Sequence, residues 1–98
     1  DQLNNISSSA TLNENKGVGT TLCNKLKDFA IKNKCKAIRL ITTNDNLKAL
    51  GFYQKRGFVL NRLFPNAMEN VRKMKNIPLI GDNNIPLRDE IELILSLT

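Results

Sequence analysis

The chain contains 98 residues, enough for one small domain. Hydrophobic residues make up 41% of it, a fraction well above the range of disordered chains. Fifteen Lys and Arg residues against nine Asp and Glu residues give a formal net charge of +6. This surplus favours anionic partners such as phosphate-bearing cofactors, nucleic acid or an acidic surface, but a solvated basic face explains the charge more simply.

The residue content also excludes several classes of chemistry. There is no histidine, so Ser-His and Cys-His nucleophilic catalysis are not available. Cys23 and Cys35 belong to no paired-cysteine motif, which argues against a metal site and favours a reduced, cytoplasmic chain. No apolar run approaches the roughly 20 residues of a membrane helix, and no segment resembles a signal peptide. The chain begins at Asp1 without an initiator methionine, so we expect a fragment or a processed product.

The first half of the chain predicts a strand, a glycine loop, a helix and a second strand. Leu3–Thr11 is predicted as the first strand. A helix is predicted from Val18 to about Lys32, because apolar residues recur there at helical spacing. These residues are Val18, Leu22, Leu26, Phe29 and Ala30. Ala37–Thr42 is short and β-branched, as in a buried parallel strand, so the order is that of a βαβ unit.

The second half predicts a helix from about Leu47 to Arg56, with candidate caps in Thr43–Asn46 and Gly57 in the left-handed position after its end. A strand, a short helix, an extended stretch broken by a turn and a final strand follow, at Phe58–Leu63, Asn66–Lys75, Ile77–Leu87 and Glu90–Leu97. Glu90 and Glu92 alternate with apolar residues of the final strand and are predicted to be surface charges. Residues 1–98 are therefore predicted to form one α/β domain with a mixed, partly antiparallel sheet.

The glycine loop Gly17-Val18-Gly19 suits a phosphate or pyrophosphate. Two glycines one residue apart let the backbone approach a ligand closely, and the helix that follows adds N–H donors and the positive end of its dipole. The same glycines can also simply relieve a tight turn. A Walker-type loop is excluded because Lys16 precedes the glycines. A dinucleotide fingerprint is excluded because Leu22 stands where a third glycine is needed.

A second motif, on the next helix, selects among these ligands. Glu14-x-x-Gly17-x-Gly19, followed by Asn46-x-x-Ala49-x-x-x-Tyr53-x-x-x-Gly57-Phe58, resembles the GNAT superfamily of acyl-CoA-dependent N-acetyltransferases. The resemblance covers Leu3 to about Leu63 by motif and the final strand by topology. It implies a GNAT-like acyl-CoA N-acyltransferase fold that is incomplete at its N-terminus, so that this chain would be the C-terminal, cofactor-binding half.

The resemblance also implies roles for individual residues. The pyrophosphate of coenzyme A would be bound by the loop residues Asn15, Lys16, Gly17, Val18, Gly19 and Thr20. Asn46 would hydrogen-bond the cofactor or simply cap its helix, with Asn44 a weaker candidate for either role. Tyr53 would protonate the departing CoA thiolate as a general acid, or would pack its ring in the core. Glu14 departs from the Gln or Arg that is usual in the family, which leaves more of the binding to the loop backbone and Lys16.

The cofactor would lie where the strands Leu3–Thr11 and Ala37–Thr42 splay apart. Backbone N–H groups near Ser8, Ser9 and Ala10 would there polarise the thioester carbonyl. With preceding strands absent, Leu3–Thr11 would form an exposed edge that pairs with another copy or with a missing N-terminal piece.

The predicted function is acetyl-CoA-dependent transfer of an acetyl group to a primary amine, whose identity the sequence does not reveal. No metal and no membrane partner is expected. The alternatives are a truncated module that binds coenzyme A without catalysis and a basic nucleic-acid-binding module. The aromatic residues fall mostly at predicted core positions and offer no stacking platform, which argues against nucleic acid. They are Phe29, Phe52, Tyr53, Phe58 and Phe64.

Overall fold

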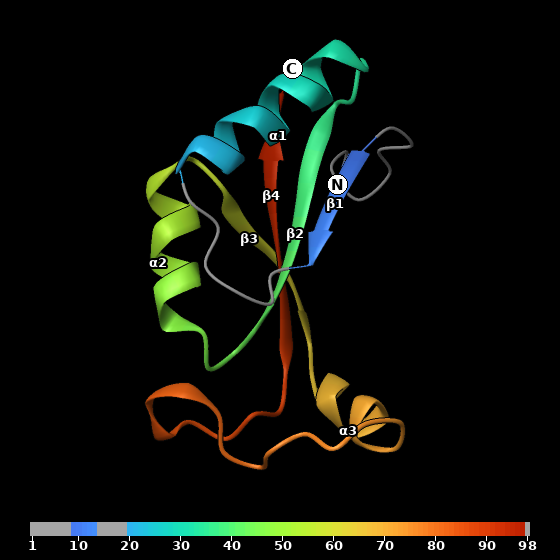
Figure 1. The fold of residues 1–98 in the computed structure, drawn as a ribbon, viewed down its shortest axis with the longest axis vertical. Coiled ribbons are helices and arrows are strands. Elements are labelled where there is room, and N and C mark those ends of the chain that lie inside the picture. Colours follow the sequence, from blue (N-terminus) through green and yellow to red (C-terminus); the bar gives the residue numbers. More distant parts are fainter. Residues whose placement is uncertain (1–8, 14–19, 98) are drawn as a thin grey trace.

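A computed structural model describes residues 9–13 and 20–97 of the chain. Strands and helices alternate over most of this length (Figure 1). In chain order the elements are β1 (Ser9–Asn13), α1 (Thr20–Lys32), β2 (Ala37–Thr43), α2 (Leu47–Lys55), β3 (Val59–Phe64), α3 (Ala67–Arg72), a 3-10 turn η2 (Asp82–Asn84) and β4 (Glu90–Ser96).

The described strands form one mixed sheet in the order β1-β2-β4-β3. β1 pairs with β2 in parallel, from Ser9 opposite Ala37 to Asn13 opposite Ile41. β4 runs antiparallel to both β2 and β3, so the last strand of the chain lies between them. The mixed α/β architecture confirms the fold class predicted from the sequence.

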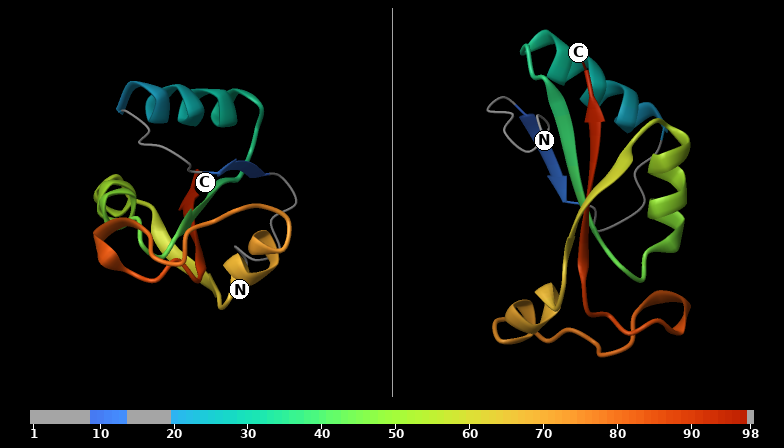
Figure 2. Two further views of the ribbon diagram at one scale, coloured as in Figure 1. Left: turned by 60° about the horizontal axis from the view of Figure 1, so that its bottom comes forward. Right: turned by 180° about the vertical axis from the view of Figure 1, so that it is seen from behind.

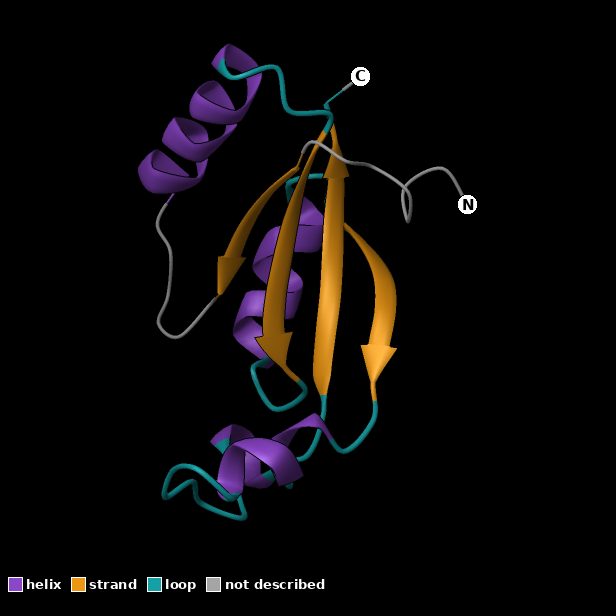
Figure 3. Cartoon of the chain, turned by 90° about the vertical axis from the view of Figure 1, so that its right-hand side faces the viewer, coloured by secondary structure: helices purple, strands orange, loops and turns teal. Residues whose placement is uncertain are grey.

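The hydrophobic core lies between one face of this sheet and the helices α1 and α2 (Figure 3). Leu40 of β2 and Leu93 of β4 are paired across the sheet and fully buried. Ala30 from α1 and Ala49 from α2 pack onto the same cluster. Removing these side chains from water is the main force that holds the helices on the sheet.

The apolar stripe of α1 is buried only in part. Leu26 and Ala30, one turn apart, pack against the core. Phe29 is rotated by about 100° around the helix axis from its neighbour Ala30, and 59% of it is exposed. The prediction that the aromatic residues occupy mostly core positions therefore holds for Tyr53 and Phe58 but is wrong for Phe29.

Most elements begin and end within a few residues of their predicted bounds. The predicted first strand, Leu3–Thr11, overlaps β1 from Ser9 to Thr11, and β1 continues to Asn13. Residues 1–8 lie outside the described part of the chain. Within the described sheet β1 is an edge strand, as predicted.

The ends of α2 follow the predicted chemistry. Asn46 Oδ1 accepts a hydrogen bond from Ala49 N at 3.1 Å, which satisfies one of the free N–H groups at the helix start. After the helix, Gly57 has φ +98°, a left-handed conformation that strains any residue with a Cβ. The turn at Gly57 lets Phe58 reach the core, where it is buried.

The predicted surface position of Glu92 is wrong, since only 2% of this residue is exposed. β4 is a central strand rather than an edge, so neighbouring strands flank it on both sides. Arg39 Nε on β2 donates to Glu92 Oε1 at 2.8 Å and compensates its charge. Alternation along the sequence cannot reveal such a partner, because residue 39 is 53 positions away.

Candidate functional site

The candidate site lies at the carboxyl ends of the parallel strands β1 and β2, which point to the same end of the molecule (Figure 1). In open α/β sheets this end collects ligands, because the loops that leave the strands meet there. The predicted parallel neighbours are confirmed. β1 stays paired with β2 over all five of its residues, so the predicted divergence of the strands does not occur within Ser9–Asn13.

The predicted phosphate loop falls almost wholly outside the described residues. Asn15, Lys16, Gly17, Val18 and Gly19 belong to the undescribed range 14–19. Thr20 is the first residue of α1, whose start was predicted at Val18. Ser8 is also undescribed, while Ser9 and Ala10 lie on β1 opposite Ala37 and Ile38.

Asn46 uses both ends of its side-chain amide within the protein. Its oxygen caps α2, and its Nδ2 donates to Thr42 Oγ1 at 3.3 Å. Thr42 is itself buried on the core face of β2. The capping role that the sequence left open is therefore present, and a contact with the cofactor stays a prediction.

Tyr53 lies in the hydrophobic core, with 2% of the residue exposed. Its ring meets Phe52 and Phe58 edge-to-face, at centroid distances of 5.1 and 5.5 Å. These contacts fix the ring on the side of α2 that faces the sheet. The packing role is thus present, and the general-acid role stays a prediction about the phenol group.

Asn44, the weaker candidate at this site, has a structural role. Its Oδ1 accepts from the backbone N–H groups of Arg88 and Asp89 at 3.1 and 3.0 Å, and its Nδ2 donates to Pro86 O at 2.9 Å. The side chain therefore binds the segment before β4 to the end of β2. Its partners are more than 40 positions away in the chain, so no local signal could have identified this role.

Asp45 is a buried residue that the sequence analysis missed. Its Oδ2 accepts from Asp82 N at 2.8 Å, and its backbone carbonyl accepts from Asn83 Nδ2 at 3.2 Å. Within the described residues its other oxygen, Oδ1, has no hydrogen-bond partner. A Cβ on Gly81 would lie 2.0 Å from Oδ2, so only glycine lets the η2 turn approach this carboxylate. Together Asn44 and Asp45 hold the connection between α3 and β4 at the site end of the sheet (Figure 2).

Arg56, directly after α2, makes contacts within the protein. Its guanidinium carbon lies 3.5 Å from the centre of the Phe52 ring, and its Nη1 donates to Phe52 O at 3.0 Å. These contacts hold the cation against α2.

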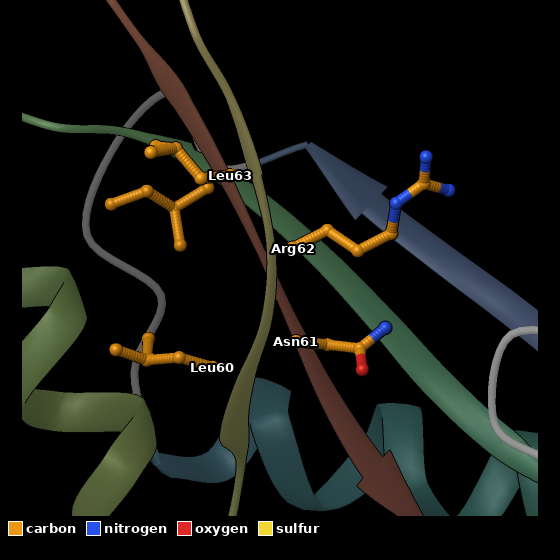
Figure 4. Close-up of a pocket in the computed structure, with 5 residues that line it drawn as sticks. Leu60, Asn61, Arg62 and Leu63 are labelled. Atoms are coloured by element: carbon orange, nitrogen blue, oxygen red, sulfur yellow. The ribbon is translucent and has the colours of Figure 1, made fainter. Parts of the chain in front are cut away.

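A shallow hollow of about 340 Å³ lies beside β3, two strands away from β2 in the sheet (Figure 4). It is lined by Leu60, Asn61, Arg62, Leu63 and Ile91. Among the described residues no group of His, Cys, Asp or Glu is arranged to hold a metal ion. No helix in the described ranges is long and apolar enough to cross a membrane.

Comparison with known families and structures relates this arrangement to a family. Residues 14–58 match the acetyltransferase (GNAT) family, and this match includes both the glycine loop and the whole of α2. This segment of the chain is similar to the GNAT family. The predicted resemblance is therefore confirmed over the segment that suggested it.

Two curated relatives come from Bacillus subtilis strain 168. Uncharacterized protein YxbD is 56% identical over 85 residues, which are 86% of this chain and 54% of YxbD. Uncharacterized protein YdhI is 49% identical over 79 residues, which are 80% of this chain and 49% of YdhI. The chain thus spans about half the length of the curated relatives it matches.

Solved structures share the fold. A GNAT family acetyltransferase from Elizabethkingia anophelis with acetyl-CoA bound aligns with a TM-score of 0.72 at 23% identity, over 90% of this chain and 61% of that one. A Bacillus subtilis acetyltransferase in complex with CoA aligns with a TM-score of 0.73 at 24% identity, over 90% of this chain and 62% of that one. At this identity the likeness establishes the GNAT fold.

Proposed function

We propose that this chain is the cofactor-binding half of an acetyl-CoA-dependent N-acetyltransferase that acts on a primary amine in the cytoplasm. The observation that carries the proposal is the family match over residues 14–58, which joins the glycine loop to α2. The shared fold of proteins whose structures hold acetyl-CoA or CoA supports the same ligand. The net charge of +6 suits a cosubstrate that carries several phosphates.

In this proposal the loop from Asn15 to Thr20 binds the pyrophosphate through backbone N–H groups, the Lys16 charge and the Thr20 hydroxyl. A single charge at a helix start contributes only about 0.3–1 kcal/mol, so affinity comes from the whole cluster. Asn46 already fixes the start of α2 through Ala49 N and would add a hydrogen bond to the cofactor.

The proposed chemistry is direct acyl transfer. The amine nitrogen attacks the thioester carbonyl carbon, whose oxygen is stabilised by backbone N–H groups of β1. The tetrahedral intermediate then collapses, the C–S bond breaks, and the amine loses a proton to water. Tyr53 protonates the departing thiolate as a general acid and recovers its proton from solvent.

Calorimetry with acetyl-CoA tests the binding step. Gly19→Glu should weaken binding roughly tenfold or more, because a carboxylate would stand where the pyrophosphate approaches. Gly51→Glu is the matched control: a Cβ on Gly51 would have nothing within 4 Å, so the same change on α2 should leave binding unaltered. Absence of acetyl-CoA binding by the unaltered chain would refute the proposal.

Tyr53→Phe tests the chemical step. We expect acetyl-CoA affinity to stay nearly constant while kcat falls roughly 100-fold, within the usual range for loss of a general acid. Release of the CoA thiol with a panel of amines measures the rate, and urea unfolding of the same variant checks that the ring still packs. An unchanged kcat would remove Tyr53 from the mechanism.

Coverage of only half of the relatives' length supports a second candidate, a segment that binds coenzyme A without turnover. Acetyl-CoA binding without thiol release for any amine would favour that candidate. Calorimetry with duplex DNA tests the alternative of a basic nucleic-acid-binding module. Binding of DNA without binding of acetyl-CoA would refute both candidates that bind coenzyme A.

A further inference from the structure

The strand β3 is the outer strand of the described sheet on the side away from β1. Three of its six residues are large, apolar and exposed: Val59 (53%), Leu60 (55%) and Leu63 (59%). An edge strand presents unpaired N–H and C=O groups along its free side. Backbone groups and apolar side chains are thus both available on this edge.

An irregularity in β3 determines where its side chains point. Leu60 pairs with Leu93 and Leu63 pairs with Ile91, so both leucines belong to the face that carries the core. The register shifts between Leu60 and Arg62, and Asn61 is the extra residue. Figure 4 shows Leu60 and Leu63 pointing to one side of the strand, while Asn61 and Arg62 point to the other.

Because of this bulge, the pattern of faces along β3 reads the same in both directions. The face of the sheet opposite the core face is the second face. Val59, Arg62 and Phe64 belong to it, because they pair with Ile94, Glu92 and Glu90. Along residues 59–64, positions 60 and 63 therefore face the core side of the sheet, and positions 59, 61, 62 and 64 face the second side. Such a palindrome is what a two-fold antiparallel pairing of identical strands requires.

We propose that β3 pairs antiparallel with β3 of a second copy of this chain, about a two-fold axis between Asn61 and Arg62. Leu60 then lies opposite Leu63 of the second copy, and Val59 lies opposite its Phe64. A shift by one residue in either direction sets residues of opposite faces against each other, so the bulge selects this register. The proposal goes beyond acetyl transfer and does not depend on it.

The proposed register is compatible with a second copy as the occupant. Arg62 lies opposite Asn61 of the second copy, so no like charges are directly opposed in the new ladder. The hollow beside β3 is lined in part by Leu60 and Leu63, so the proposed pairing brings the two leucines of the second copy next to it. A six-residue ladder buries less than the roughly 800 Å² per partner of a standard interface, so the dimer is weak and concentration-dependent.

Disulfide trapping tests the register. In a Cys23→Ser, Cys35→Ala background, one batch carries Leu60→Cys and a second carries Leu63→Cys. Directly opposed residues in an antiparallel pair have Cα atoms about 4.5–5.5 Å apart, within disulfide range. Two copies of position 60 would lie three residues out of register, roughly 10 Å apart and out of range.

The expected result is a disulfide-linked heterodimer when the two batches are mixed and oxidised, with little linked dimer in either batch alone. The two variants have equal masses, so the link is identified from the tryptic peptides it joins, since cleavage after Arg62 separates position 60 from position 63. Equal linkage in all three samples would show random collision and overturn the register. No linkage in a sample whose circular dichroism is native would overturn the proposal.

Sedimentation equilibrium of the chain with its own cysteines, kept reduced, provides a second measurement. Leu60→Lys with Leu63→Lys should weaken dimerisation roughly tenfold or more, since like charges then face each other twice. Leu79→Lys is the matched control on a residue that is 71% exposed outside the sheet, and it should leave association unchanged. A monomer at every concentration, or equal loss in both variants, would refute self-pairing through β3.

Discussion

The two faces of the sheet are built from the same strands but rest on different interactions. On the core face, Leu40 and Leu93 meet α1 and α2 in an apolar cluster. On the second face, one position along each strand, Arg39 and Glu92 form a part-buried ion pair. Apolar burial is non-directional and tolerates small shifts, whereas a buried carboxylate requires a particular partner. Stability of the core face should therefore depend on side-chain volume, and stability of the second face on pairing.

The largest effect is expected from the core face. Leu40→Ala should lower the free energy of unfolding by about 2–5 kcal/mol. The substitution loses the favourable transfer of apolar atoms from water to the core, and it leaves a cavity in a fully buried position. Urea unfolding measures the change. The same substitution at the exposed Leu79 is the control and should cost little. Equal losses at the two positions would contradict the location of the core.

The ion pair should respond to charge rather than to volume. Arg39→Ala leaves the Glu92 carboxylate buried without its partner and should cost about 1–3 kcal/mol, less than in a fully buried pair because Arg39 is partly exposed. Replacing both residues, as Arg39→Met with Glu92→Leu, should recover most or all of this loss. If the double variant lost as much as the sum of the single variants, the second face would depend on volume like the first.

A smaller effect is expected where α2 begins on the core face. Asn46→Ala removes the oxygen that caps Ala49 N and should lower the free energy of unfolding by about 1 kcal/mol. Asn46→Asp retains an accepting oxygen and should keep most of that stability. An acetyl-CoA titration of the aspartate variant then isolates the proposed cofactor role. Weaker binding with unchanged stability would support it, and unchanged binding would remove it.

The smallest effect is expected at the margin of the core face. Phe29→Ser should change the free energy of unfolding by less than about 0.5 kcal/mol, because most of this side chain is already in water. Ala30→Leu, one residue further on, should cost about 1–3 kcal/mol by overpacking a fully buried position. A larger loss of stability for Phe29→Ser than for Ala30→Leu would mean that Phe29, and not Ala30, faces the sheet.

Local chemistry explains which features the sequence revealed. The apolar period of α1, the cap at Asn46 and the left-handed turn at Gly57 each depend on residues within about four positions of one another. The two motifs that identified the GNAT family are likewise short segments in a fixed order. Short-range rules were sufficient for these features because the interacting groups are neighbours in the chain.

The features that the sequence missed all depend on distant partners. Glu92 was predicted on the surface because alternation cannot show that β4 inserts between β2 and β3. Asn44 and Asp45 were not identified as anchors because their partners at residues 82–89 are about 40 positions away. For Tyr53 the tertiary structure reveals burial between Phe52 and Phe58 while leaving its chemistry to experiment.

By itself, then, the sequence determined the order of helices and strands, the caps of α2 and the family, because those features follow from local periodicity and short motifs. Only the tertiary structure decided the order of the strands, the pairing of Arg39 with Glu92 and the exposed, bulged edge at β3. The physical reason is that strand pairing and charge burial depend on which segments meet in space, and that choice is made by the whole chain.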